Sequence, residues 1–256
     1  MGRGPVVQAR KNAVNSAKGK VFSLHAKLIA MAAQKGGNPD DNPTLAMLIT
    51  KAKKDSVPND TIDRAIKKGT GEDKEATQIS EIIYEGYAPG GVALLVSTLT
   101  DNKNRTVSNI RSVFSKCGGN MGESGAVSWM FHKKGVIFID PKKYEYEKIE
   151  ELIFETAAED IEQNPEYIKV VTSLEDYNDV EKFLESKEIE LLESKLDYIP
   201  DNEIEVTDFD QALKITKMIE AFNEDEDVSL VSSNEIISSE LQSQVDEFID
   251  KNTFRT

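Results

Sequence analysis

The chain has 256 residues, 39% of them hydrophobic and 30% charged, and its formal net charge is −15. This length allows one large domain or two to three small ones. No apolar run approaches the roughly 20 residues of a membrane helix, the N-terminus lacks the apolar core of a signal peptide, and the single cysteine, Cys117, excludes an intrachain disulfide. We therefore expect a soluble, cytoplasmic protein without a membrane partner.

Charge is unevenly distributed along the chain. Residues 1–78 carry 14 Lys/Arg against 8 Asp/Glu, a net charge of +6, and residues 79–139 carry 6 against 4. Residues 140–256 carry 11 against 34, a net charge of −23. A basic N-terminal third suits a polyanion such as nucleic acid, which the acidic half would repel. The alternative is that small helical domains are often mildly basic.

The N-terminal third reads as a basic arm over 1–16 followed by a helical bundle domain over 17–78. Apolar residues recur every three or four positions from Ser16 to Gln34, which predicts a helix. A second helix begins at Asn42-Pro43, a typical N-cap followed by proline, and runs to Lys54. A third spans 59–68 and is closed by Gly69. Residues 69–78 read as a linker.

The rest of the chain alternates strand and helix patterns. Strands are expected at 82–84, 92–96 and 127–131, with a helix over 107–117. A strand at 136–139, a helix over 146–158, a strand at 167–172, a helix over 174–186 and a strand at 191–199 form an acidic unit. A helix over 208–222, a strand at 228–231 and a terminal amphipathic helix over 235–251 remain.

A lone helix and strand cannot bury a core, so the helix over 208–222 and the strand at 228–231 are expected to return to the first sheet. We therefore predict an α+β fold: an N-terminal three-helix bundle plus two α/β sandwich domains, one inserted in the other. The split domain covers 79–132 and 203–238, the inserted acidic domain 133–202, and a helical tail 239–256.

Basic side chains in the N-terminal third are the candidate nucleic-acid contacts. Several lie near helix C-termini, where they also complement the helix dipole, but the dipole explains only one or two of them per helix. The candidate contacts are Arg10, Lys11, Lys18, Lys20, Lys51, Lys53, Lys54, Arg64, Lys67 and Lys68.

Two glycine-rich loops bracket the 92–117 region. The first, Gly86 to Gly91, joins two strands and lacks the Lys-Ser/Thr of a phosphate-binding loop, so it reads as a tight hairpin with Tyr87 exposed at its tip. Aromatic, amide and guanidinium groups on one surface suit contact with RNA or a ribonucleoprotein. The predicted partner-contact residues are Tyr87, Pro89, Gly90, Lys103, Asn104 and Arg105.

Catalytic chemistry is poorly represented. A nucleophile pair of Cys117 and His132 is conceivable, but Cys117 falls on an apolar helix face, where buried thiols are common. No His/Cys cluster has metal-ligand spacing. We expect no enzyme activity, no cofactor, no metal and no small-molecule substrate.

Several motifs together resemble the YebC family of probable transcriptional regulatory proteins, which includes a mitochondrial translational activator. They are YEGYAPGG, DNKNRT, FSKCGGNMG and FHKKG, and in the N-terminal third GKVFS, GGNPDDNP and PNDTIDRAIKKGTG. The resemblance covers roughly residues 10–240. It implies a helical first domain, a second domain built from two chain segments, and an inserted third.

The resemblance implies one of two non-catalytic roles. The first is DNA-binding transcriptional regulation, and the alternative is a ribosome-associated translation factor that binds ribosomal RNA and relieves stalling on proline-rich stretches. Net charge −15 and the lack of a helix-turn-helix favour the alternative physically. Three departures from the family pattern are the arm Gly2 to Val7, the segment Asn42 to Ala46, which lacks two expected positive charges, and the tail beyond Glu240.

Overall fold

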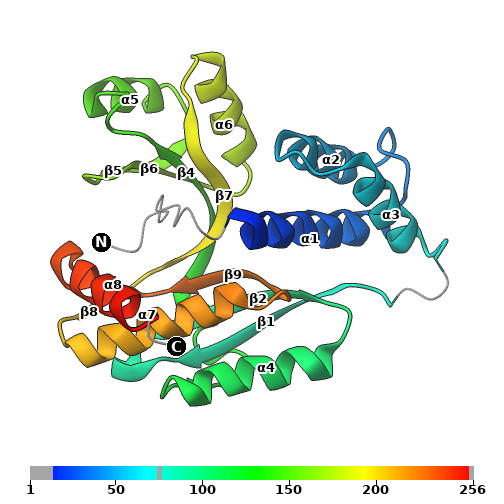
Figure 1. The fold of residues 1–256 in the computed structure, drawn as a ribbon. Coiled ribbons are helices and arrows are strands. Elements are labelled where there is room, and N and C mark those ends of the chain that lie inside the picture. Colours follow the sequence, from blue (N-terminus) through cyan, green and yellow to red (C-terminus); the bar gives the residue numbers. More distant parts are fainter. Residues whose placement is uncertain (1–13, 74–76, 254–256) are drawn as a thin grey trace.

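The structure, a computed structural model, describes residues 14–73 and 77–253. The predicted basic arm, including Arg10 and Lys11, falls almost entirely outside these residues. Within them, an N-terminal helical unit is followed by two four-stranded sheets (Figure 1). Among the described residues, no helix is both long and apolar enough to cross a bilayer.

The N-terminal unit consists of α1 (Val14–Ala33), α2 (Pro43–Lys54) and α3 (Asn59–Thr70). The side-chain oxygen of Asn42 accepts a hydrogen bond from the N–H of Leu45 at 3.1 Å, so α2 begins as the sequence predicts. α3 ends at Thr70, two residues later than predicted, and Gly71 caps it. The φ of Gly71 is 77°, a left-handed value that glycine adopts without strain. The helices do not close their core alone, because Ile79 and Leu99 also belong to it.

The first sheet has the strand order β3-β1-β2-β9 and draws on distant parts of the chain. Every residue of its central strand β2 is buried, so both faces of the sheet are covered. The bounds are β1 (Ser80–Tyr87), β2 (Ala93–Thr100), β3 (Asn120–Met121) and β9 (Val228–Ser233). The expected return of the chain to this sheet is thus present, as β9.

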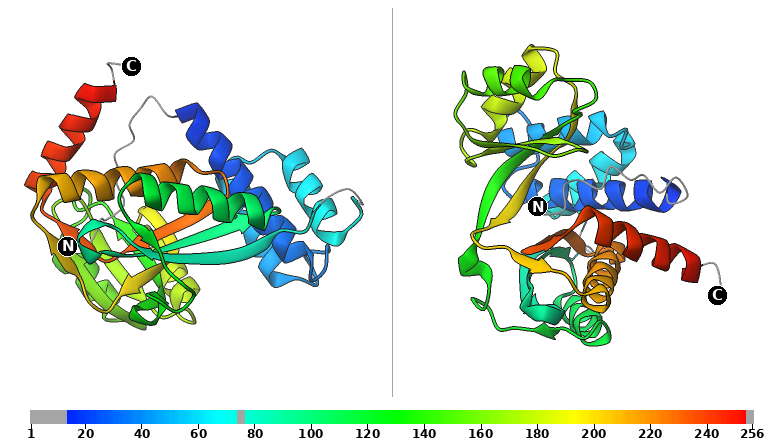
Figure 2. Two further views of the ribbon diagram at one scale, coloured as in Figure 1. Left: turned by 90° about the horizontal axis from the view of Figure 1, so that it is seen from below. Right: turned by 90° about the vertical axis from the view of Figure 1, so that its left-hand side faces the viewer.

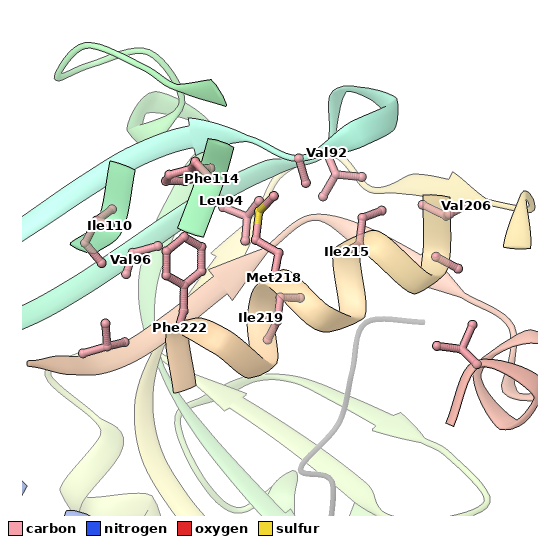
Figure 3. Close-up of a cluster of buried hydrophobic side chains, with 14 of the residues drawn as sticks. Val92, Leu94, Val96, Ile110, Phe114, Val206, Ile215, Met218, Ile219 and Phe222 are labelled. Carbon is pink, nitrogen blue, oxygen red and sulfur yellow. The ribbon is translucent and has the colours of Figure 1, made fainter. Parts of the chain in front are cut away.

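One face of this sheet is covered by α4 (Lys103–Lys116) and α7 (Phe209–Glu224), which lie side by side (Figures 1 and 2). Phe114 from α4 and Phe222 from α7 meet edge to face with ring centroids 5.0 Å apart. Both are fully buried over Leu94 (Figure 3). The terminal helix α8 (Ser239–Thr253) extends this core with Val245 and Ile249.

The opposite face is covered by three separate segments. Leu95 packs against Val127 of the loop that follows β3, against Phe131 at the end of that loop, where the second sheet begins, and with Tyr198 of that sheet. Leu99 packs into the core of the N-terminal helices. The sheet therefore holds the N-terminal unit and the second sheet on one side.

The second sheet has the order β5-β6-β4-β7 and is antiparallel throughout. One face packs on its two helices through an aliphatic core that includes Ile137, Ile168 and Leu184. The bounds are β4 (Phe131–Ile139), α5 (Tyr146–Ile153), β5 (Ala158–Gln163), β6 (Ile168–Thr172), α6 (Tyr177–Ser186) and β7 (Leu191–Pro200). The chain enters and leaves through the long β4–β7 pair, and β8 (Ile204–Val206) then pairs in parallel with β10 (Glu235–Ile237).

The predicted α+β class is confirmed, but three elements were predicted wrongly. The predicted terminal helix over 235–251 begins only at Ser239, and residues 235–237 instead form β10 beside β8. Residues 127–131 alternate like a strand, yet they form a loop with a 3-10 turn, η2 (Ser128–Met130), and Phe131 begins β4. The predicted helix over 146–158 ends at Ile153, and residues 158–163 form the edge strand β5. β5 has a single large apolar residue, Ile161, so it carries little hydrophobic pattern.

Candidate nucleic-acid interface

Two basic residues of α1, Lys20 and Lys27, point inward to a single acidic loop. Lys20 Nζ donates hydrogen bonds to the backbone carbonyls of Asn223 and Asp225, the latter at 2.8 Å. Lys27 Nζ donates to the carbonyl of Glu226 at 2.7 Å. Burial lowers the pKa of Lys20, against the opposing charge of Asp225. These contacts attach α1 to the loop before β9.

Asp227 is the centre of this attachment. Its carboxylate is 4% exposed and accepts hydrogen bonds from Lys27 Nζ at 2.9 Å, Thr106 Oγ1 at 2.9 Å and Arg105 Nη2 at 2.8 Å. Burial alone would raise the pKa of Asp227, but the hydrogen bonds from Lys27, Arg105 and Thr106 outweigh it and lower that pKa to about 2. The network joins α1, α4 and β9.

Arg105 is therefore engaged within the chain. Half of its side chain is exposed, but its guanidinium contacts both oxygens of Asp227 and also reaches Asp101 at 3.3 Å. A guanidinium paired with a buried carboxylate has few donors left for a partner. The predicted contact role of Arg105 thus competes with an internal structural one.

Two lysines of α2 contact the inserted acidic unit. Lys51 Nζ donates to the hydroxyl of Tyr177 at 3.3 Å and lies 5.4 Å from the centre of that ring. Lys54 Nζ pairs with the carboxylate of Glu185 at 3.0 Å, with both side chains largely exposed. A hydrogen bond to Glu185 raises the pKa of Lys54. Both contacts reach α6, so α2 lies against the insert.

Three predicted contacts remain open to solvent. Lys53, Arg64 and Lys67 are exposed, and within the described part of the chain none of them forms an ion pair. Arg64 and Lys67 line a shallow hollow with Glu72 and Asp73. Lys68 is half-buried and approaches Asp101 at 3.5 Å. Lys18 belongs to α1, but its side chain is outside the described residues.

The Tyr87 loop differs from the prediction. Tyr87 is half-buried, and its hydroxyl donates a hydrogen bond to the carbonyl of Ala126 at 3.0 Å, so it is not an exposed tip. The two glycine loops pack on each other: a Cβ at Gly119 would lie 2.5 Å from the Tyr87 carbonyl oxygen. Pro89 is half-buried, and besides Arg105 the predicted contact residues that stay exposed are Gly90, Lys103 and Asn104.

The sequence reading missed Glu85, which organises the loop after β3. Its buried carboxylate accepts hydrogen bonds from the backbone N–H groups of Gly125, Val127 and Ser128 at 2.8, 2.7 and 2.8 Å. Burial would raise the pKa of Glu85, but these N–H donors lower it. The loop so fixed presents Trp129, whose side chain is 67% exposed. Because the partners are backbone groups, no side-chain pattern could have revealed them.

The cationic residues on the outer sides of α4 and α7 were also missed. Arg111 and Lys116 on α4 and Lys214 and Lys217 on α7 are exposed. Counting Arg105, α4 carries four basic residues and no acidic one, an observable signal in the sequence.

Comparison with known proteins identifies relatives over most of the chain. Residues 5–72 match the family model described as "TACO1/YebC protein N-terminal domain", and residues 79–235 match "TACO1/YebC second and third domain". A "Probable transcriptional regulatory protein" of Maridesulfovibrio salexigens is 44% identical over 94% of this chain and 96% of its own length. One of Brachyspira hyodysenteriae is 43% identical over 92% of this chain and 95% of its own.

A solved structure supports the same assignment. The crystal structure of a conserved hypothetical protein, Aq1575, from Aquifex aeolicus is 38% identical and matches with a TM-score of 0.83, covering 92% of this chain and 97% of that one. The matched regions include both glycine loops, the inserted acidic unit and the N-terminal helices. The chain belongs to the TACO1/YebC family.

Proposed function

We propose that this protein regulates gene expression by binding nucleic acid, without catalysis and without a cofactor. The names of its relatives support a regulatory role. Binding is assigned to the N-terminal helical unit, in the only third of the chain with a strong net positive charge.

The observation that carries the proposal is the free set of cations on α2 and α3. Lys53, Arg64 and Lys67 are exposed and lack an ion pair among the described residues. Several neighbouring lysines are engaged by acidic groups of the same chain, as Lys27 is by Asp227. Cations without an ion pair in a chain of net charge −15 are available to phosphate groups, and within the described residues only Arg64 of the three has another hydrogen bond, from its Nε to the backbone carbonyl of Asp60 at 3.0 Å.

Promoter DNA is the first candidate target, because the relatives are named as probable transcriptional regulators. In this form the three cations would contact the phosphate backbone, which orients a protein without reading sequence. Side chains that reach base edges would still be needed for specificity.

Ribosomal RNA is the second candidate, favoured by the small number of free cations. Three phosphate contacts give a salt slope of about 2.7 on duplex DNA, well below that of proteins making roughly 6–10 contacts. A few contacts suffice when a protein docks on a large folded particle with several surfaces at once. In this form the chain would act as a ribosome-associated translation factor.

Two features support a non-enzymatic role. Burial raises the pKa of the Cys117 thiol more than the nearby Lys217 and Lys116 lower it, so the thiolate is disfavoured. His132 pairs with Asp201 at 2.8 Å.

Cosedimentation with ribosomes, run beside a mobility-shift assay on promoter DNA at physiological salt, separates the two targets. Sequence-specific shifts without cosedimentation would establish the transcriptional form and exclude the ribosomal one. Cosedimentation that is lost in a Lys53→Glu/Arg64→Glu/Lys67→Glu variant would establish the ribosomal form. Absence of binding in both assays would refute the proposal.

A further inference from the structure

We propose that the outer sides of α4 and α7 form a second phosphate-binding surface, which contacts the backbone of the same nucleic acid. This inference rests on the proposed function. We call this surface the α4/α7 face and define it by Lys103, Arg111 and Lys116 of α4 with Lys214 and Lys217 of α7. All five side chains are exposed, and none forms an ion pair among the described residues.

The sequence of α4 separates its two sides sharply. Thr106, Ile110 and Phe114 are buried on the inner side. The outer side carries Arg111 with hydroxyl and amide groups, of which Ser108 donates to the carbonyl of Asn104 and Asn109 to the carboxylate of Asp225. The helix itself has no acidic residue. Every other long helix that follows it, such as α7 and α8, contains carboxylates. Phosphate contacts commonly combine cations with Ser and Asn side chains, which donate to the same oxygens.

The two helices bring their cations together. α4 and α7 lie side by side on one face of the first sheet, tied by the Phe114–Phe222 contact (Figures 1 and 2). The charges of Lys217 and Lys116 both act on the thiol of Cys117 at the end of α4. One cation from each helix is thus near enough to Cys117 to act on its thiol, and together they raise the local positive potential.

Lysines elsewhere on the acidic half are neutralised more often. Lys134 pairs with Glu159 at 2.7 Å and Lys143 with Glu190 at 2.6 Å. A solvated helix surface could carry unpaired lysines without any function, but in a chain of net charge −15 it would also be expected to carry acidic residues, and α4 carries none. An acidic protein is a less suitable occupant, because the exposed side of α4 offers few apolar side chains for a protein interface core.

The α4/α7 face lies on a different part of the molecule from α2 and α3 (Figures 1 and 2). A folded RNA, which presents separate backbone segments, can contact both surfaces at once. The face therefore favours a folded RNA over a straight duplex as the ligand.

The test compares charge reversals that change net charge equally. The first variant is Arg111→Glu/Lys116→Glu/Lys217→Glu. The matched control is Lys142→Glu/Lys148→Glu/Lys182→Glu, which reverses three exposed lysines of the acidic insert. A third variant, Lys53→Glu/Arg64→Glu/Lys67→Glu, tests the N-terminal site. Fluorescence anisotropy with a labelled hairpin RNA and a labelled DNA duplex gives affinity against salt, and thermal melting confirms folding.

We expect the first variant to bind roughly tenfold more weakly or worse than the wild type and its salt slope to be lower by about 2–3 on the probe that it binds. The affinity of the control variant should decrease far less, and its salt slope should stay that of the wild type. If only the N-terminal variant loses affinity, the α4/α7 face is refuted and the proposed function stands. If only the first variant loses affinity, the α4/α7 face is supported and the N-terminal site is refuted. If the wild type binds neither probe, both are refuted. Milder Gln substitutions at the same three positions should act in the same direction.

Discussion

Lys27 of α1 and Asp227 of the loop before β9 form an ion pair of 2.9 Å between groups 200 residues apart. Their side chains are 16% and 4% exposed, so the pair is shielded from solvent on both sides. Arg105 and Thr106 complete the shell around the carboxylate. This one acidic group connects the N-terminal unit to the split sheet.

Replacing Asp227 by asparagine should destabilise the protein. The amide cannot neutralise Lys27 and Arg105, and hydrogen bonds to a charged group contribute about 1.5–3 kcal/mol. We expect a loss of about 2–3 kcal/mol in the free energy of unfolding, measured by urea denaturation. Asp101→Asn is the matched control, because Asp101 also contacts Arg105 but is far more exposed. Its loss should stay below about 1 kcal/mol, and an equal loss would contradict the central role of Asp227.

The contribution of Asp227 should depend on pH. Its pKa is about 2 in the folded protein, against about 3.9 in an unfolded chain. The lowered value means that the stabilisation is complete above the unfolded pKa and is lost as pH falls toward 2. The difference in stability between wild type and Asp227→Asn should therefore shrink by about 2 kcal/mol between pH 5 and pH 2. A difference that stays constant over this range would show that the carboxylate charge is not responsible.

Glu85 should control the loop that carries Trp129. In Glu85→Gln one of the three backbone N–H groups faces an amide N–H instead of an oxygen, at a cost of about 1–3 kcal/mol. Trp129 is the only tryptophan of the chain, so its fluorescence anisotropy reports on this loop alone. We expect lower anisotropy in Glu85→Gln and none of this effect in Glu81→Gln, whose side chain is exposed on the same strand. Unchanged anisotropy would mean that other contacts hold the loop.

Cys117 should behave as an unreactive thiol. Because burial raises its pKa, little thiolate is present near neutral pH. Alkylation by iodoacetamide should be slower than that of glutathione under the same conditions, and Cys117→Ser should keep full nucleic-acid binding. Faster alkylation than glutathione would revive the enzyme interpretation.

Local signals in the sequence predicted much of the fold. Asn42-Pro43 marked the start of α2, and the apolar run from Val92 marked a central strand, because capping and burial patterns depend on neighbouring residues. The alternation over 127–131 predicted a strand wrongly, since the N–H groups of Val127 and Ser128 bond to Glu85 rather than to a neighbouring strand.

Contacts between distant residues could not be predicted. The sequence marked the cations Lys20, Lys51 and Lys54 as candidate contacts, but their partners lie 126 to 205 residues away. Arg105 was predicted to be a surface contact for the same reason, because its internal partner, Asp227, is distant in the sequence. A single sequence does not reveal which cation faces which carboxylate, and so it does not separate engaged lysines from free ones.

The central claim is that free cations of the N-terminal unit bind nucleic acid. The most direct measurement is the salt dependence of binding to ribosomes and to promoter DNA, for the wild type and for Lys53→Glu/Arg64→Glu/Lys67→Glu. We predict that the wild type binds one of them at physiological salt and that the variant binds more weakly, with a slope lower by about 2–3. Equal affinity and equal slope for the two proteins would contradict the claim.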